Sequence, residues 1–124
     1  MSDQSIVRHL EQQVSTADIL RRAKALIGTP DKWLHGRNAV SADGKRGCIG
    51  CAIGAAMNAS GRWDIWQGKN SAAFALMETV VPDVANIPNM KLKVFRFNAH
   101  PDTTHADVMR AFDCAIAIAE RGER

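Results

Sequence analysis

Three stretches of the chain repeat apolar residues at helical spacing, and each predicts an amphipathic helix. The first covers residues 16–27, the second lies between residues 70 and 82, and the third covers residues 104–122. Each begins at a residue type that caps helices, and the first two end at Gly28 and Pro82. The predicted caps are Ser15 or Thr16, Asn70 or Ser71, and Thr104 with Asp107 in a capping-box-like arrangement.

The segment from Cys48 to Ala59 has a different pattern, because it is small and apolar almost all round. A helix without a polar face belongs in the interior of a protein. Gly50 and Gly54 lack bulk, so neighbouring helices can approach this segment closely. The pattern therefore predicts an interior helix with the amphipathic helices around it.

The remaining segments predict connections and one strand. Residues 29–47 are rich in turn-forming residues and form a loop anchored by Trp33, and residues 60–69 form a connection. Residues 91–97 alternate loosely, which predicts a minor β element paired with part of the loop after Trp33. Residues 1–14 predict a loosely ordered arm or a short helix.

Together these patterns predict a mainly α fold, a compact bundle of about four helices around a buried small-residue helix. Residues 15–124 form its single domain. The composition agrees, because 124 residues with 46% apolar and 23% charged residues are typical of one globular domain. No stretch reaches the roughly 18 apolar residues that span a bilayer, and the N-terminus lacks a secretory signal pattern, so we expect a cytoplasmic protein without a membrane partner.

The positions of the cysteines and histidines along the chain suggest either a metal site or a catalytic cysteine. Cys48 and Cys51, followed by His100 and His105, have the ligand types of a structural zinc site, but buried reduced cysteines that pack as small hydrophobic residues explain the first pair without a metal. Packing is the favoured interpretation, and no cofactor is expected. The odd count of three cysteines also argues against a disulfide framework.

A catalytic cysteine is the alternative use of the same segment. Cys48 lies near a predicted helix start, where the helix dipole stabilises a thiolate, and His100 could act as base with Asn98 or Asp102 orienting it. The alternative function is thus a cysteine-dependent hydrolase or transferase using Cys48 or Cys51 with His100. Nothing in the sequence shows that these residues meet in the folded protein.

Nucleic acid is a weaker candidate partner. The net charge of +3 is mild and spread along the chain. In a strand, Lys91, Lys93, Phe95 and Phe97 would share one face and could bind a single strand. An edge strand with protective lysines and inward phenylalanines is the favoured interpretation.

Five short segments of the chain form an ordered set: Trp33-Leu34-His35-Gly36, Cys51-Ala52-Ile53-Gly54-Ala55, Phe97-Asn98, Thr104 with Asp107-Val108, and Asp113-Cys114-Ala115-Ile116. This set resembles an uncharacterised family of small bacterial and phage proteins. Members of that family carry Trp-x-x-Gly, Cys-x-x-Gly-Ala, Trp-Asn-Asp and Thr-x-x-Glu-Val in that order. Ala99 replaces the aspartate of the third motif. The resemblance covers about residues 16–121 and implies a shared fold but no activity.

Polar and aromatic residues placed in loops indicate where binding would occur. The favoured function is a small binding or regulatory module for an unidentified small molecule or protein, rather than an enzyme. Its cleft would be formed by the Trp33–Gly36 loop, the Cys48/Cys51 helix start and the Asn98–Asp102 segment. The candidate ligand-binding residues are Trp33, His35, Asn98, His100 and Asp102.

Overall fold

The computed structural model describes residues 15–84, 87 and 89–122, so the predicted arm at residues 1–14 lies outside the described residues. The described helices are α2 (Thr16–Leu26), α3 (Ile49–Met57), α4 (Ile65–Lys69), α5 (Ala72–Val80), α6 (Lys93–Ala99) and α7 (His105–Gly122), with a 3-10 turn at Pro30–Lys32. Among these residues, β pairing is limited to two isolated bridges, Trp33–Gly47 and Val40–Gly47. The mainly α fold is confirmed.

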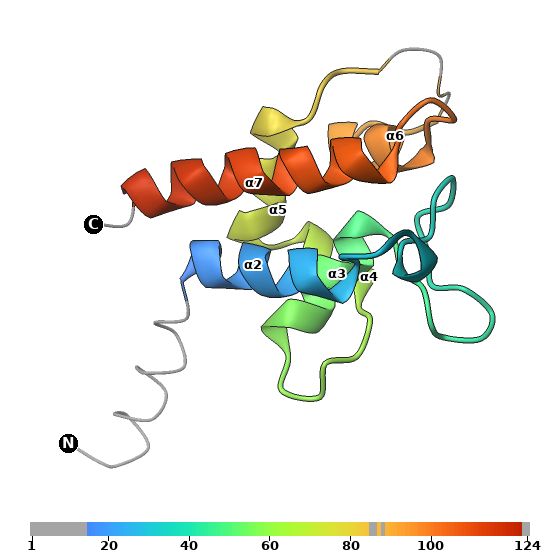
Figure 1. Cartoon of the computed structure of the whole chain (residues 1–124), viewed down its shortest axis with the longest axis horizontal. Coiled ribbons are helices and arrows are strands. Elements are labelled where there is room, and N and C mark those ends of the chain that lie inside the picture. Colours follow the sequence, from blue (N-terminus) through green and yellow to red (C-terminus); the bar gives the residue numbers. More distant parts are fainter. Residues whose placement is uncertain (1–14, 85–86, 88, 123–124) are drawn as a thin grey trace.

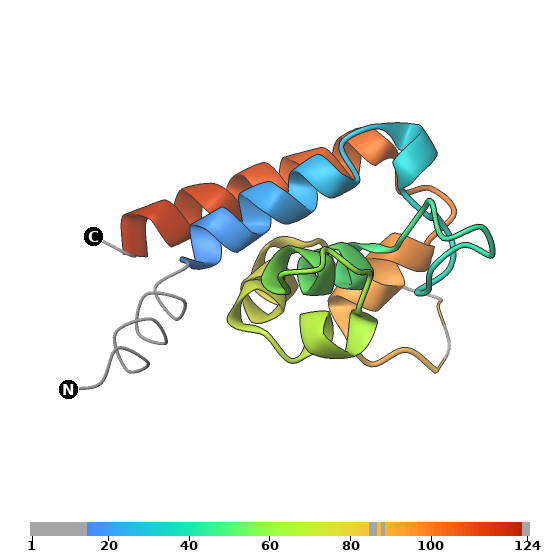
Figure 2. The same cartoon turned by 90° about the horizontal axis from the view of Figure 1, so that it is seen from below.

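Helix α3 is the interior helix that its sequence predicts. Every residue from Ile49 to Ala56 is buried. Helices α2, α4, α5 and α6 contact it, while α7 packs on α2 and α5. Figure 2 shows α3 beneath the pair of long helices α2 and α7. In the described part of the chain, no helix is long and apolar enough to cross a membrane.

Glycines let α3 and α4 touch backbone to backbone. A Cβ atom added to Gly54 would lie 1.7 Å from the carbonyl oxygen of Asp64, and one added to Gly68 would lie 1.9 Å from that of Gly50. Helix α4 corrects the prediction that residues 60–69 are a plain connection. Asp64 accepts a hydrogen bond from the Gln67 amide at 3.0 Å and caps this short helix, which has too few residues to display an apolar period.

Helices α2 and α7 lie side by side and run antiparallel (Figures 1 and 2). Lys24 pairs with Asp113 at 2.6 Å, and Arg21 pairs with Glu120 at 3.2 Å, across this contact. The predicted caps are confirmed at the start of α2, α5 and α7. These caps are Ser15 bonded to the Asp18 amide, Ser71 bonded to the Phe74 amide, and the reciprocal bonds between Thr104 and Asp107.

Residues 93–99 form helix α6, so the predicted strand at residues 91–97 is wrong. The N-cap residue, Leu92, has no side chain that can cap a helix. Glu78 of α5 takes that role, because its carboxylate accepts hydrogen bonds from the amides of Lys93 and Val94. A cap supplied by another helix leaves no local signature in the sequence.

Helix α6 also removes the strand face on which the weaker, nucleic-acid-binding interpretation depended. Phe97 is buried, and Phe95 packs edge-on against Phe74 with ring centroids 5.3 Å apart. Lys91 lies before the helix and Lys93 in its first turn, so the four residues do not line one face of a strand. The loop after Trp33 still contacts this segment, since Asn38 donates to the carbonyl oxygen of Phe95 at 3.2 Å.

Removing the distant cap should weaken the fold measurably. We expect Glu78→Ala to lower the free energy of unfolding by about 1 kcal/mol, because two helix amides lose their acceptor. Urea unfolding followed by circular dichroism measures the change. The control is Glu120→Ala, which removes only an exposed ion pair and should change stability by about 0.5 kcal/mol or less. Equal stability of Glu78→Ala and the unmodified protein would contradict the capping role.

Candidate functional site

The side chain of Asn98 joins the three segments that the sequence analysis grouped into one site. It is fully buried in α6. Its Oδ1 accepts hydrogen bonds from Trp33 Nε1 at 2.8 Å and from the Ile49 amide at 3.1 Å. Its Nδ2 donates to the carbonyl oxygens of Leu34 at 3.1 Å and Arg37 at 3.0 Å. All four hydrogen-bonding positions of the amide are thus used within the protein.

Aromatic rings pack behind the same loop. Trp33 is buried and stacks on His35, with ring centroids 4.6 Å apart. The Nε2 atom of His35 lies 2.7 Å from the carbonyl oxygen of His100, which ties the loop to the segment after α6. The predicted segments therefore meet, but Trp33, Asn98 and both cysteines are buried among them. The hydrogen bonds of Asn98 with Trp33 and with the Leu34 and Arg37 carbonyl oxygens hold the loop in place.

Cys48 and Cys51 lie at the first turn of α3, and both are fully buried. Their sulfur atoms are 3.0 Å apart, with the Cys48 thiol donating to Cys51, and the Cys51 amide donates to the Cys48 sulfur at 3.3 Å. The hydrogen bond from Cys48 lowers the pKa of Cys51. The same contact, together with burial, raises the pKa of Cys48.

His100 and His105, the histidines of the zinc and catalytic interpretations, contact backbone atoms through their rings. His100 Nδ1 accepts from the Asp102 amide at 3.1 Å, and His105 Nε2 lies 2.8 Å from the carbonyl oxygen of Ile27. In the part of the chain that the structure describes, no three His, Cys, Asp or Glu side chains converge to hold a metal ion, so the residues of the less favoured zinc interpretation do not come together. No hydrogen bond in that part joins either cysteine to His100.

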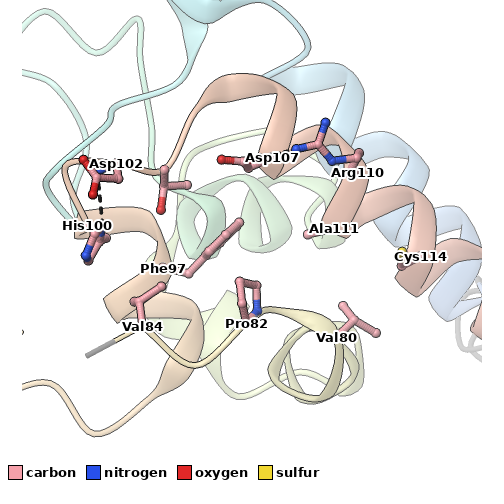
Figure 3. Close-up of a pocket in the computed structure, with 11 residues that line it drawn as sticks. Val80, Pro82, Val84, Phe97, His100, Asp102, Asp107, Arg110, Ala111 and Cys114 are labelled. Atoms are coloured by element: carbon pink, nitrogen blue, oxygen red, sulfur yellow. Dashed lines mark hydrogen bonds and ion pairs between the residues drawn. The ribbon is translucent and has the colours of Figure 1, made fainter.

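A pocket of about 470 Å³ lies between α5, α6 and α7, and part of the Asn98–Asp102 segment lines it. Figure 3 shows Val80, Pro82 and Val84 along one side of it and the α7 side chains along the other. Its lining residues are Val80, Pro82, Val84, Phe97, His100, Asp102, Thr103, Asp107, Arg110, Ala111 and Cys114. Of the ligand-binding, catalytic and zinc candidates from the sequence, only His100 and Asp102 line this pocket.

Phe97, Asp107 and Cys114 lie in the family-like motifs, but nothing in the sequence joins them or the other lining residues into one site. Arg110 stands on the polar face of α7, where a solvated arginine is the ordinary expectation, and Val80 ends an apolar helix. They become neighbours only through the packing of α5 against α7. A pocket assembled from separate helices leaves no spacing in the sequence that would identify it.

The charged residues that line the pocket differ in whether they have a partner within the protein. Asp107 is bonded to Thr104 and Arg110, and the Thr104 hydrogen bonds, with the nearby guanidinium, hold the pKa of Asp107 below its ordinary value. Among the described residues, no ion pair engages the exposed carboxylate of Asp102. Because His100 Nδ1 is an acceptor, its ring proton is on Nε2 and can be donated.

Comparison with known proteins gives a family and no function. Neither a curated protein nor a solved structure matches the chain. One protein family, described as a family of unknown function (DUF6197), matches residues 11–118. That range includes α2 to α6, most of α7, the Asn98 cluster and all residues of the pocket. The chain therefore belongs to the family of unknown function DUF6197.

Proposed function

We propose that the chain is a small-molecule binding module whose ligand, an amphipathic molecule with an apolar body and a cationic end, occupies the pocket between α5, α6 and α7. The observation that carries the proposal is a pocket of about 470 Å³ with the carboxylate of Asp102 at its edge. This volume is within the range of roughly 300–1,000 Å³ typical of small-molecule sites. A site of this kind suits either a carrier or a ligand-dependent regulator.

The apolar walls supply affinity for the body of the ligand. Val80, Pro82, Val84, Phe97 and Ala111 surround the pocket with side chains that cannot hydrogen-bond. An apolar group that leaves water for this space gains about 25 cal/mol per Å² of buried surface. The walls thus favour ligands with a hydrocarbon or aromatic portion.

The polar edge supports selection of a cation. The lining carries two carboxylates, Asp102 and Asp107, against one guanidinium, Arg110, whereas the whole chain carries a net charge of +3. Arg110 is already paired with Asp107, which leaves Asp102 as the carboxylate that can pair with a ligand. The Nε2 proton of His100 can serve a hydrogen-bond acceptor on the same ligand.

Binding of matched amphiphiles tests the proposal. Full-length protein is titrated with octylamine, octanol and octanoate by calorimetry, and we expect octylamine to bind most tightly. Asp102→Asn should weaken octylamine binding by about two- to fivefold, the effect of a partly exposed ion pair, and leave octanol binding unchanged. Ala111→Leu should weaken binding of all three probes because it fills the pocket.

Asp113→Asn is the matched control, because Asp113 lies on α7 but pairs with Lys24 outside the pocket. It should leave octylamine binding unchanged. Failure of all three probes to bind would remove the pocket as a ligand site. Equal binding of the three probes, unaffected by Asp102→Asn, would remove the preference for a cation.

A further inference from the structure

The two buried cysteines at the start of α3 are the strongest feature that the pocket does not use. Their sulfur atoms are 3.0 Å apart, and neither residue lines the pocket. We propose that Cys48 and Cys51 are a redox-active dithiol that hydrogen peroxide oxidises to an intramolecular disulfide. This inference is independent of the proposed function.

The geometry needs little change to close the bond. A disulfide has a sulfur–sulfur distance of about 2.05 Å, so the sulfur atoms must approach by about 1 Å. Cys48 is the N-cap of α3, and its extended backbone directs its sulfur back over the first turn, where the Cys51 amide donates to it. Each sulfur already has the other as its side-chain partner.

The pair is also chemically unequal, as a two-step oxidation requires. The Cys48 thiol donates to the Cys51 sulfur and so stabilises a Cys51 thiolate, which lowers the pKa of Cys51. Cys48 holds its proton more firmly, since that hydrogen bond and burial raise its pKa. Cys51 is therefore the attacking sulfur, and Cys48 is the resolving one.

The reaction balances with peroxide as the oxidant. The Cys51 thiolate attacks one peroxide oxygen, a sulfur–oxygen bond forms, the oxygen–oxygen bond breaks, and hydroxide leaves and takes up a proton from solvent. The Cys48 sulfur then attacks the Cys51 sulfenic acid, the sulfur–sulfur bond forms, and hydroxide leaves with the Cys48 proton as water. Two thiols are oxidised, and one peroxide is reduced to two waters.

Burial favours a small oxidant over a bulky disulfide. Both cysteines are fully buried, and the ring of Trp63 packs directly on Gly47, next to Cys48. Hydrogen peroxide is close to water in size, whereas a disulfide reagent would need the segment to open. Because the closed ring would span only Cys48 to Cys51, the bond would stabilise the fold less than one that closes a long loop. These properties fit a reversible redox site better than a structural disulfide.

Peptide mass spectrometry tests the proposal in a Cys114→Ser background, which removes the exposed third thiol. The folded protein is treated with hydrogen peroxide, free thiols are alkylated, and trypsin then releases residues 47–62, which contain both cysteines. We expect this peptide to lose two hydrogen atoms and both alkylation sites, and dithiothreitol to restore them. Adding Cys48→Ser or Cys51→Ser should abolish this loss.

Met57 lies in the same peptide and reports exposure to the oxidant, because its sulfoxide adds an oxygen instead of removing hydrogens. Complete alkylation of both cysteines in the peroxide-treated folded protein, with the disulfide forming only after unfolding in urea, would overturn the proposal. Accumulation of sulfinic acid at either cysteine without the disulfide would overturn it too.

Discussion

Replacement of Asn98 by alanine is expected to lower the free energy of unfolding by about 4 kcal/mol or more. The substitution leaves two buried donors, Trp33 Nε1 and the Ile49 amide, and two carbonyl oxygens, those of Leu34 and Arg37, without their partner. Each unsatisfied buried polar group costs about 1–3 kcal/mol. Since the total stability of a domain is about 5–15 kcal/mol, this one change approaches the limit at which the fold is lost.

Urea denaturation followed by tryptophan fluorescence measures the loss, because Trp33 donates directly to Asn98. Asn70→Ala is the control with the same chemical change. Asn70 is exposed, and its amide donates to one carbonyl oxygen, that of Trp66, so the expected change is about 1 kcal/mol or less. A loss below about 1.5 kcal/mol for Asn98→Ala would mean that the buried amide does not hold the loop in place.

A methyl group at Gly54 is expected to lower the free energy of unfolding by about 3 kcal/mol, although alanine favours a helix by about 1 kcal/mol over glycine. Its Cβ would lie 1.7 Å from the carbonyl oxygen of Asp64 and 3.0 Å from the Gly68 amide. Both contacts are backbone atoms, which cannot rotate away as a side chain can. Helices α3 and α4 must therefore separate.

Gly50→Ala is the matched control within the same helix. Its Cβ would meet only side-chain atoms, with Ile65 and Phe95 nearest at 3.3 Å, and these can shift slightly. We expect a change of about 1 kcal/mol or less, measured by thermal and urea unfolding of both variants. Equal stability of the Gly54 and Gly50 variants would contradict the backbone contact between α3 and α4.

Features with a local physical cause were predictable from the sequence. The interior position of α3 follows from its lack of a polar face, and Ser15, Ser71 and Thr104 cap helices through bonds to residues three positions away. The small residues Gly50 and Gly54 correctly predicted a close approach to a neighbour. Which segment approaches these glycines was not predictable, because that segment, helix α4, is only five residues long.

The incorrect predictions depend on contacts between segments that are far apart in the sequence. Residues 91–97 lack a local cap and alternate loosely, so a strand was the natural interpretation, whereas the carboxylate of Glu78 and burial of Val94 and Phe97 select the helix. The same limit applies to the candidate site. His100 and Asp102 were found from polar residues in one short loop, but their pocket neighbours come from α5 and α7 and carry no joint signal.

The antiparallel pairing of α2 with α7 determines when the molecule can assemble during synthesis. Helix α2 ends at Leu26, but its partner begins at His105, so the ribosome must produce the whole intervening segment and α7 itself before this contact can form. Until then, the face of α2 that packs against α7 lacks that partner. The final packing of the newly made chain therefore depends on α7, the last described helix to leave the ribosome.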